Sequence, residues 1–311
     1  MRRVYVAVFG VLLGLAVLLA ALFFIMNPEK KALSPVIRAG LPGQFIALTD
    51  GVTYYQLSGP ADGPLVVLVH GFSIASYGWE RNVPALTAAG LRVLTYDLYG
   101  RGYSDRPDVT YDLDLFVRQL DELLTALDIH QPVDIAGISM GGYISAGFAA
   151  RHPERVRRIV LMAPQSETMD SDARMKWVTL PGVGEYLFTV YIGPFVMVDS
   201  QDEFNAYMPS SDWHDRYLDM MQYAGFRNAL LSTLRNMTGD PFEQYRKVGE
   251  LGFDVLLLWG DLDDTVPIGN AQKVLAAIPQ AEFYTIPGAR HESAYELPEI
   301  VNPRLIDFLK R

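Results

Sequence analysis

The stretch VDIAGISMGGYISAGFAA, residues 133–150, decides the fold of this 311-residue chain. It opens with the short apolar run Val133–Ala136, which is typical of a buried strand, and closes with the small-residue run Tyr143–Ala150, which is typical of a tightly packed helix. Between them, residues 137–141 fit the pattern G-x-S-x-G. We therefore predict a strand, a sharp turn that exposes Ser139, and a helix, the arrangement known as a nucleophile elbow.

The predicted elbow needs further groups before Ser139 can react. The backbone N–H of Met140 should lie at a helix N-terminus, where it can donate to a developing oxyanion. The base must come from a loop at the carboxyl edge of the sheet, because only such a loop reaches Ser139. His291, just after the last predicted strand, fits best, and His70, at the end of a central strand, is the runner-up.

A carboxylate is needed to orient the histidine and to stabilise its charged form. The predicted strand Val255–Trp259 leads into GDLDDTVP, residues 260–267. Asp261, Asp263 and Asp264 compete for the role there. The chain order serine, aspartate, histidine is the one expected for a triad built on this type of elbow.

Working outward, short β-rich runs alternate with amphipathic segments such as Leu113–Ile129. This alternation predicts an α/β fold, a mostly parallel eight-stranded sheet with helices on both faces. Besides the two strands already named, the predicted strands are Phe45–Leu48, Val52–Leu57, Leu65–Val69, Val93–Tyr96, Ile159–Met162 and Phe283–Ile286.

Residues 165–247 contain no evident strand and are rich in Met, Trp, Tyr and Phe. The segment is too long for a loop in a compact domain, so we predict a helical cap. The expected domains are an N-terminal transmembrane anchor at residues 1–27, a juxtamembrane linker at 28–43, a core formed by 44–164 and 248–311, and the cap at 165–247.

The segment Val4–Met26 is uncharged, and as a helix it would extend about 35 Å, enough to cross a bilayer. A cleaved signal peptide is the alternative, but the run is long for one and no small-x-small site follows it. Arg2 and Arg3 favour a cytosolic N-terminus with the rest of the chain outside, periplasmic or extracytoplasmic, whereas Lys30 and Lys31 argue for the reverse.

Gly10 and Gly14 form a G-x-x-x-G pattern inside this segment. Small residues at that spacing let two helices approach closely, which predicts a homodimer through Gly10 and Gly14. Glycine is also common in ordinary membrane spans, so the pattern is equally compatible with a helix that does not pair.

The overall composition excludes several classes of function. The chain has no cysteine, which rules out disulfides, thiolate metal ligands and a cysteine nucleophile. Its net charge of −10 disfavours nucleic acid as a partner. With five histidines and no cysteine, neither a metal site nor a cofactor is expected.

Over residues 44–310 the chain resembles the α/β-hydrolase-fold serine hydrolases. The resemblance rests on four short segments in addition to the elbow. HGF at 70–72 resembles the oxyanion loop of the family, and DLYGRGYS at 97–104 resembles its D-x-x-G-x-G-x-S turn. WG at 259–260 with Asp263 and Pro267 resembles the acid loop. Gly288, His291, Glu296 and Pro298 resemble the histidine loop.

The resemblance implies a catalytic triad of Ser139, Asp263 and His291. It further implies an oxyanion hole made by the backbone N–H groups of Phe72 and Met140. His70 would then be structural, and Asp97 would order its own turn. Some members take the acid from the loop after the preceding strand, which makes Glu167 a weaker rival to Asp263.

Members that displace halide or open epoxides carry Asp at the elbow, so Ser139 disfavours both reactions and implies an acyl-enzyme. Together with the anchor, the chain is similar to membrane-anchored monoacylglycerol lipases, lysophospholipases and phospholipases of the A type. The expected substrate is a lipid ester. The alternatives are a carbon–carbon bond hydrolase or amidase with the same triad, and a non-catalytic ligand receptor or tethered interaction protein, which the complete triad disfavours.

Overall fold

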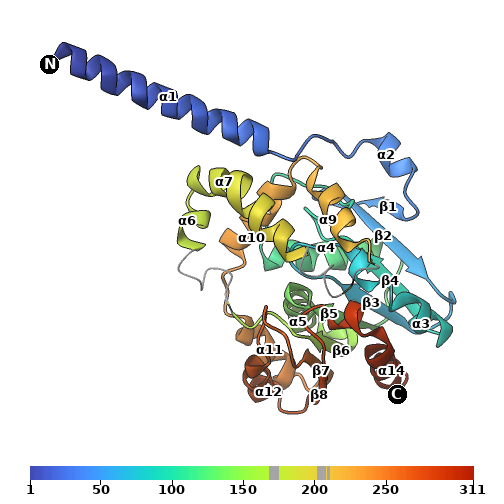
Figure 1. Cartoon of the computed structure of the whole chain (residues 1–311). Coiled ribbons are helices and arrows are strands. Elements are labelled where there is room, and N and C mark those ends of the chain that lie inside the picture. Colours follow the sequence, from blue (N-terminus) through green and yellow to red (C-terminus); the bar gives the residue numbers. More distant parts are fainter. Residues whose placement is uncertain (168–174, 202–207, 209–210) are drawn as a thin grey trace. The chain divides into compact units, whose positions relative to one another are not determined.

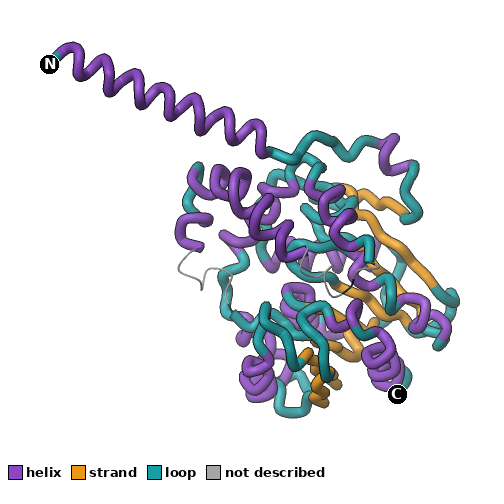
Figure 2. The backbone as a smooth tube through the Cα atoms, viewed as in Figure 1, coloured by secondary structure: helices purple, strands orange, loops and turns teal. Residues whose placement is uncertain are grey.

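The computed structural model describes residues 1–167, 175–201, 208 and 211–311, and the chain divides into two compact units. The first unit comprises residues 1–32 and 172–231, and the second comprises residues 33–171 and 232–311. The whole eight-stranded sheet belongs to the second unit (Figure 2). The predicted fold class is confirmed.

The strand order is β1-β2-β4-β3-β5-β6-β7-β8. Strand β2 is antiparallel to both of its neighbours, β1 and β4, and every other neighbouring pair, from β4 to β8, is parallel. Each predicted strand corresponds to one observed strand, with ends displaced by only a few residues. The strands are β1 (Gln44–Ala47), β2 (Val52–Ser58), β3 (Leu65–Val69), β4 (Arg92–Tyr96), β5 (Val133–Ile138), β6 (Val156–Met162), β7 (Asp254–Gly260) and β8 (Glu282–Ile286).

Helices cover both faces of this sheet (Figure 1). Val66 and Leu68 of β3 lie in one buried cluster with Leu86 of α3 and Leu305 of α14, because alternate side chains of a strand point to the same face. Helix α5 packs on the other face, beside α4 and α11. The helices of this unit are α2 (Pro35–Ala39), η1 (Ser76–Trp79), α3 (Val83–Ala88), α4 (Leu113–Ala126), α5 (Met140–Arg151), η2 (Pro153–Arg155), α11 (Pro241–Glu250), η4 (Ile268–Asn270), α12 (Ala271–Ala277), α13 (Ser293–Glu296) and α14 (Pro298–Leu309).

Helix α4 shows how local chemistry sets the ends of an element. Its first turn is capped by Asp112, whose side chain accepts the backbone N–H of Leu115 at 2.9 Å. The helix ends at Ala126, before the predicted end at Ile129. The reason is that Asp128 has a φ of 58°, which breaks the helical path.

The first unit contains α1 (Arg2–Met26), α6 (Met175–Thr179), α7 (Val183–Leu187), the π-helix η3 (Phe188–Met197) and α9 (Trp213–Met221). Helix α10 (Phe226–Asn236) begins in the first unit and ends in the second. Among the described residues, α1 is the one helix long and apolar enough to cross a membrane, and nearly all of its side chains are exposed.

The predicted linker at 28–43 is divided between the two units at residue 32. Its beginning is tied to the first unit by backbone hydrogen bonds. The N–H groups of Lys30 and Lys31 each donate to the carbonyl of Gln222 at 2.8 Å, and Ala224 donates back to Lys31 at 2.8 Å. Parts of the predicted cap, residues 168–174, 202–207 and 209–210, lie outside the described residues, and the domain boundaries stay predictions.

Candidate active site

Ser139 forms the turn between β5 and α5 by itself. Strand β5 ends at Ile138 and α5 begins at Met140, and Ser139 takes a φ of 55° and a ψ of −125°. A positive φ of this kind costs a non-glycine residue about 1–3 kcal/mol. Backbone hydrogen bonds hold it in place: Ser139 donates to Met162 at 2.9 Å, and its carbonyl accepts from Gln165 at 3.0 Å.

Two glycines make this turn sterically feasible, and a third lies beside it. A Cβ at Gly137 would lie 2.2 Å from the carbonyl oxygen of Gly141, and a Cβ at Gly141 would lie 2.3 Å from that of Val69. Both distances are far below van der Waals contact, so neither position accepts a side chain. At Gly71 a Cβ would lie 3.5 Å from the Cβ of Ser139. The loop after β3 is therefore directly beside the serine.

The same loop carries Phe72, whose backbone N–H was predicted to share an oxyanion hole with that of Met140. Met140 is the first residue of α5, so its N–H has no partner within the helix. In the described part of the chain, neither of these two N–H groups donates to another residue. Both amides therefore lack an intramolecular acceptor, as donors to a substrate oxygen must.

Arg101 binds the backbone carbonyl of Phe72 in this loop, a role that the sequence analysis missed. Its side chain is completely buried, and its Nε donates to the carbonyl of Phe72 at 2.8 Å. The guanidinium also lies 5.5 Å from the Phe72 ring and donates to the hydroxyl of Thr233 at 2.8 Å. Arg101 is the middle residue of the G-x-G part of the turn at 97–104, so the sequence motif contains it. The group that Arg101 binds, the Phe72 carbonyl, is known only from the fold.

His291 and Asp263 are brought together, with 2.9 Å between the histidine Nδ1 and the aspartate Oδ2. The Asp263 side chain is fully buried. Its other oxygen, Oδ1, accepts the backbone N–H groups of Thr265 at 3.0 Å and Val266 at 2.8 Å. Because Nδ1 is engaged by Asp263, the rival acid Glu167 is not needed to orient the ring.

The other two aspartates of this loop have different partners. Asp261 accepts the backbone N–H of Gly288 at 2.7 Å, and Asp264 forms an ion pair with Arg290 at 3.1 Å. Of the three candidates that the sequence left open, only Asp263 contacts His291. The residue types alone did not distinguish the three aspartates, whereas the resemblance to the acid loop had indicated Asp263.

The surroundings of His291 favour its protonated form. Burial lowers the pKa of the imidazole, but the hydrogen bond and negative charge of Asp263, followed by the charges of Glu292 and Glu296, outweigh it and raise the pKa above its ordinary value. Burial also raises the pKa of the Glu292 carboxyl to about 7. A histidine with a raised pKa next to a carboxylate is typical of a general base.

Glu296 holds the two ends of the segment that carries His291. One carboxylate oxygen accepts the N–H of Arg290 at 2.6 Å, and the other accepts the N–H of Glu292 at 2.9 Å. The residues on both sides of His291 are thus bound to one side chain. Burial raises the pKa of this carboxyl. The sequence analysis recorded Glu296 only as part of a motif and gave it no role.

His70, the runner-up for the base, has both ring nitrogens occupied. Its Nε2 accepts the backbone N–H of Leu98 at 2.9 Å, which leaves Nδ1 to donate to the carbonyl of Gly71 at 2.9 Å. The ring is completely buried, and burial lowers its pKa to about 3. A ring whose two nitrogens are both bonded to backbone groups is a structural link between two loops, the role that the resemblance implied.

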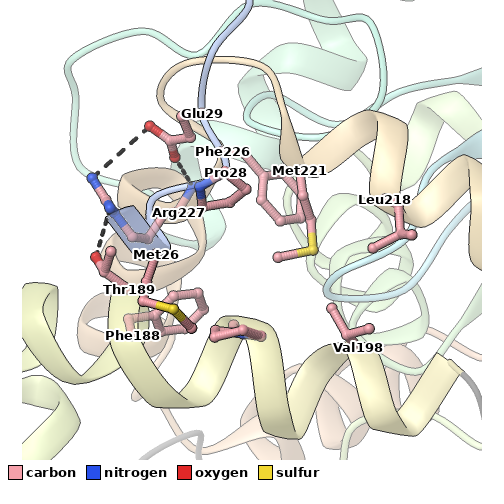
Figure 3. A pocket seen from close by; sticks show the side chains of 12 residues that line it. Met26, Pro28, Glu29, Phe188, Thr189, Val198, Leu218, Met221, Phe226 and Arg227 are labelled. Atoms are coloured by element: carbon pink, nitrogen blue, oxygen red, sulfur yellow. Dashed lines mark hydrogen bonds and ion pairs between the residues drawn. The ribbon is translucent and has the colours of Figure 1, made fainter. Parts of the chain in front are cut away.

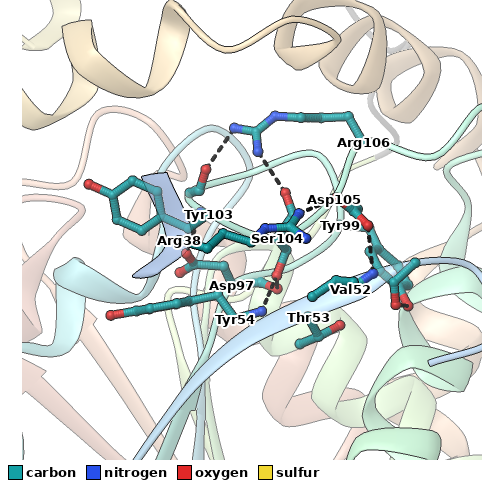
Figure 4. A network of polar contacts seen from close by, with 12 residues as sticks. Arg38, Val52, Thr53, Tyr54, Asp97, Tyr99, Tyr103, Ser104, Asp105 and Arg106 are labelled. Carbon is teal, nitrogen blue, oxygen red and sulfur yellow. Dashed lines mark hydrogen bonds and ion pairs between the residues drawn. The ribbon is translucent and has the colours of Figure 1, made fainter. Parts of the chain in front are cut away.

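Asp97 orders the turn that follows β4 (Figure 4). Its carboxylate accepts the backbone N–H groups of Ser76 at 2.9 Å and Tyr103 at 2.7 Å. The hydroxyl of Ser104 donates to the Asp97 carbonyl at 2.6 Å and accepts from the N–H of Tyr54 at 2.9 Å. All of these contacts are internal to the fold, so Asp97 supports the loops around the site.

Within the described part of the chain, no hydrogen bond joins the hydroxyl of Ser139 to His291. Catalytic hydrogen bonds are often long before a substrate is bound. The described residues also contain no group of three or more His, Asp or Glu side chains arranged to hold a metal ion. The arrangement supplies a strained serine, a histidine paired with an acid, and two unpaired amides, all within the second unit.

Comparison with known proteins agrees with this arrangement. Residues 64–298 match the model of the alpha/beta hydrolase fold family. The chain is 28% identical to a protein named as a putative non-heme chloroperoxidase from a Synechocystis species, over 86% of this chain and 98% of that protein. It is 31% identical to a 2-hydroxy-6-oxononadienedioate/2-hydroxy-6-oxononatrienedioate hydrolase from Paraburkholderia xenovorans, over 78% and 86% of the two chains.

Among solved structures, bromoperoxidase from Bacillus anthracis superimposes with a TM-score of 0.71 at 25% identity. The match covers 86% of this chain and 100% of that one. The family match spans strands β3 to β8, the elbow and the histidine loop. We conclude that the chain is a hydrolase and belongs to the alpha/beta hydrolase fold family.

Proposed function

We propose that the protein is a membrane-tethered serine hydrolase that cleaves carboxylic esters of lipids. The observation that supports the chemistry is the Asp263–His291 hydrogen bond, and the positive φ of Ser139 and the adjacent loop at Gly71 are consistent with it. Nδ1 of His291 is held by Asp263, so Nε2 is the nitrogen that takes the proton from the Ser139 hydroxyl.

The proposed reaction follows from these positions. The oxygen of Ser139 attacks the acyl carbon, and the N–H groups of Phe72 and Met140 stabilise the negative oxygen of the tetrahedral intermediate. The imidazolium of His291 then protonates the departing alcohol, which leaves an acyl-enzyme. A water molecule, deprotonated by the same nitrogen, releases the carboxylic acid and restores Ser139.

The lipid specificity rests on α1. Its 25 residues are long and apolar enough to cross a bilayer, and an enzyme held at a membrane meets substrates that reside there at high local concentration. We therefore infer a monoacylglycerol, lysophospholipid or phospholipid substrate. The tether has its N-terminus in the cytosol and the catalytic unit outside. A Cβ at Gly10 or Gly14 would meet no atom within 4 Å, so that face is open to a second copy of the helix.

A fluorophosphonate probe tests the chemistry, because it labels only an activated serine. We expect labelling of the full-length protein and none of the Ser139→Ala variant. Hydrolysis of a monoacylglycerol in vesicles, compared with a p-nitrophenyl ester of the same acid, tests the lipid preference. Retention of the protein in the membrane fraction after a carbonate wash tests the tether. A folded protein that neither labels nor hydrolyses esters would favour the receptor alternative.

The second candidate is hydrolysis of a carbon–carbon bond, which the Paraburkholderia relative favours by its name. The substrate of that relative is a dicarboxylate. A net charge of −10 on the present chain opposes the approach of a dianion, whereas it leaves an uncharged ester unaffected. Turnover of 2-hydroxy-6-oxononadienedioate at a rate above that of esters would reverse this preference.

A further inference from the structure

The first unit contains a partly open cavity of about 270 Å³ at the end of α1 (Figure 3). Its wall is mostly apolar and comes from the end of α1, the segment that follows it, helices η3, α9 and α10, and Val198 just after η3. The side chains that matter for the argument are Met26, Phe188, Val198, Leu218, Met221 and Phe226. Met26 is the last residue of α1, so the cavity lies where the membrane-spanning candidate ends.

The two charges of the wall compensate each other. Glu29 and Arg227 lie 3.9 Å apart, with side chains that are 8% and 12% exposed. The Glu29 carboxylate also accepts the N–H groups of Arg227 at 2.8 Å and Gly225 at 3.1 Å, and Arg227 donates to the Thr189 hydroxyl. Since this pair is already matched, the rest of the cavity suits an uncharged chain and not an anion.

Helix η3 is apolar on the outside as well as on the side that lines the cavity. None of its ten residues is charged. Phe188 is buried, whereas Tyr191 and Phe195 are 58% and 52% exposed. A helix that is apolar all round is normally buried or in contact with lipid. Aromatic side chains at such a surface are typical of the membrane interface.

Helix α1 is connected to these elements by direct contacts. The Phe23 ring stacks on that of Tyr186, with centroids 6.2 Å apart, and the guanidinium of Arg227 lies 5.2 Å from the Phe23 ring. If α1 crosses a bilayer, these contacts bring the exposed face of η3 to the same lipid surface. The cavity is then within reach of the acyl chains of that leaflet.

We propose that this cavity binds one acyl chain of a membrane lipid, drawn from the leaflet that α1 enters. The proposal depends on the membrane tether in the proposed function. The volume supports a single occupant: a cavity of about 150 Å³ holds a benzene ring, and sites for drug-sized molecules begin at about 300 Å³. At about 270 Å³ the cavity accommodates part of one chain and not the two chains of a diacyl lipid.

Photocrosslinking of the full-length protein tests this. The protein is placed in phosphatidylcholine vesicles that contain a lysophosphatidylcholine with a diazirine in its acyl chain, irradiated, and digested for mass spectrometry. We expect adducts on Phe188 and Met221, whose side chains are only 2% and 5% exposed and are reached from inside the cavity. Adducts along α1 serve as the internal standard for insertion.

Leu218→Trp fills the cavity and should reduce the adducts on Met221 at least fivefold relative to those on α1. Leu251→Trp is the matched control, because Leu251 is 39% exposed, close to the 37% of Leu218, and does not line the cavity. Val198→Phe fills the cavity from another wall in case Leu218→Trp does not fold, which near-ultraviolet circular dichroism would show. Both filling variants should keep the adducts on α1.

Adducts on α1 without any on Phe188 or Met221 would overturn the acyl-chain site and leave the tether intact. Adducts on Met221 that persist unchanged in both filling variants would also overturn it. An absence of adducts on α1 itself would instead contradict the tether, and with it the premise of the proposal.

Discussion

Replacing Asp263 with Asn is the most informative perturbation of the proposed triad. Oδ1 of Asp263 accepts two backbone N–H groups, those of Thr265 and Val266, while Oδ2 faces Nδ1 of His291. In the variant, the amide oxygen must stay at the Oδ1 position, because an NH₂ group there would meet two donors. The NH₂ group is then forced to face His291.

The expected loss of kcat in Asp263→Asn follows from this forced orientation of the amide. Turning the amide over would deprive the two partly exposed N–H donors of their acceptor, at about 0.5–1.5 kcal/mol each, so the flipped form is disfavoured by about 1–3 kcal/mol. In the retained form Nδ1 must accept a hydrogen bond, which moves the ring proton to Nε2, the nitrogen that has to be free. For a wrong tautomer of this kind we expect kcat to fall by about 10⁴, equivalent to about 5 kcal/mol.

The assay is the kcat of p-nitrophenyl ester hydrolysis, with circular dichroism to confirm folding. Asp261→Asn and Asp264→Asn are matched controls, since each carboxylate has a partner other than His291. Both should keep kcat within about tenfold of the wild type. A loss of less than tenfold in Asp263→Asn, or a large loss in either control, would refute the reasoning.

Four further predictions follow from the same geometry. Ser139→Ala should abolish ester hydrolysis in a folded protein, so residual hydrolysis by purified variant would disprove its role as the nucleophile. Because the pKa of His291 is raised and catalysis needs its neutral form, kcat/KM should increase as the pH rises through a pKa above the ordinary 6.5 and should be lost below it; a pH–rate profile flat from pH 5 to 8 would contradict this. Arg101→Met releases the carbonyl of Phe72 and should lower kcat by about 10–100-fold with little change in KM, measured beside the thermal midpoint; an unchanged kcat would exclude a positioning role. Gly14→Ile should weaken dimers of the full-length protein in crosslinking experiments, and undiminished dimers would show that this face does not pair.

The strands of the sheet could be predicted from the sequence because buried parallel strands are uninterrupted apolar runs. Leu65–Val69 is an uninterrupted apolar run, and all of its residues are buried. Helix α5 begins at Met140, as expected for an N–H at a helix N-terminus, although the small-residue run that indicated the helix was only Tyr143–Ala150. Gly141 lies inside the helix and allows its close approach to β3.

The missing parts of the site depend on tertiary contacts. Nothing local distinguishes the buried Arg101 from a surface arginine until the loop that contains Phe72 is folded over it. Helix η3 had no polar periodicity by which to recognise it, and it contains Pro194. The pairing of Ser139 with a base was inferred from the order of the motifs, and the structure shows a hydrogen bond only between the proposed acid, Asp263, and the proposed base, His291.

The crowding around Gly137 and Gly141 has a consequence for how this enzyme could be altered. The backbone there leaves no room for a side chain at either glycine, whereas Ser139 itself carries one. The φ of 55° strains Cys or Asp in much the same way as Ser, since none of the three is branched at Cβ, so either residue in place of Ser139 would be presented at the same point. The side chain at position 139 can therefore be exchanged for one of these, whereas Gly137 and Gly141 cannot be replaced. Directed evolution of new chemistry should vary position 139 and leave both glycines untouched.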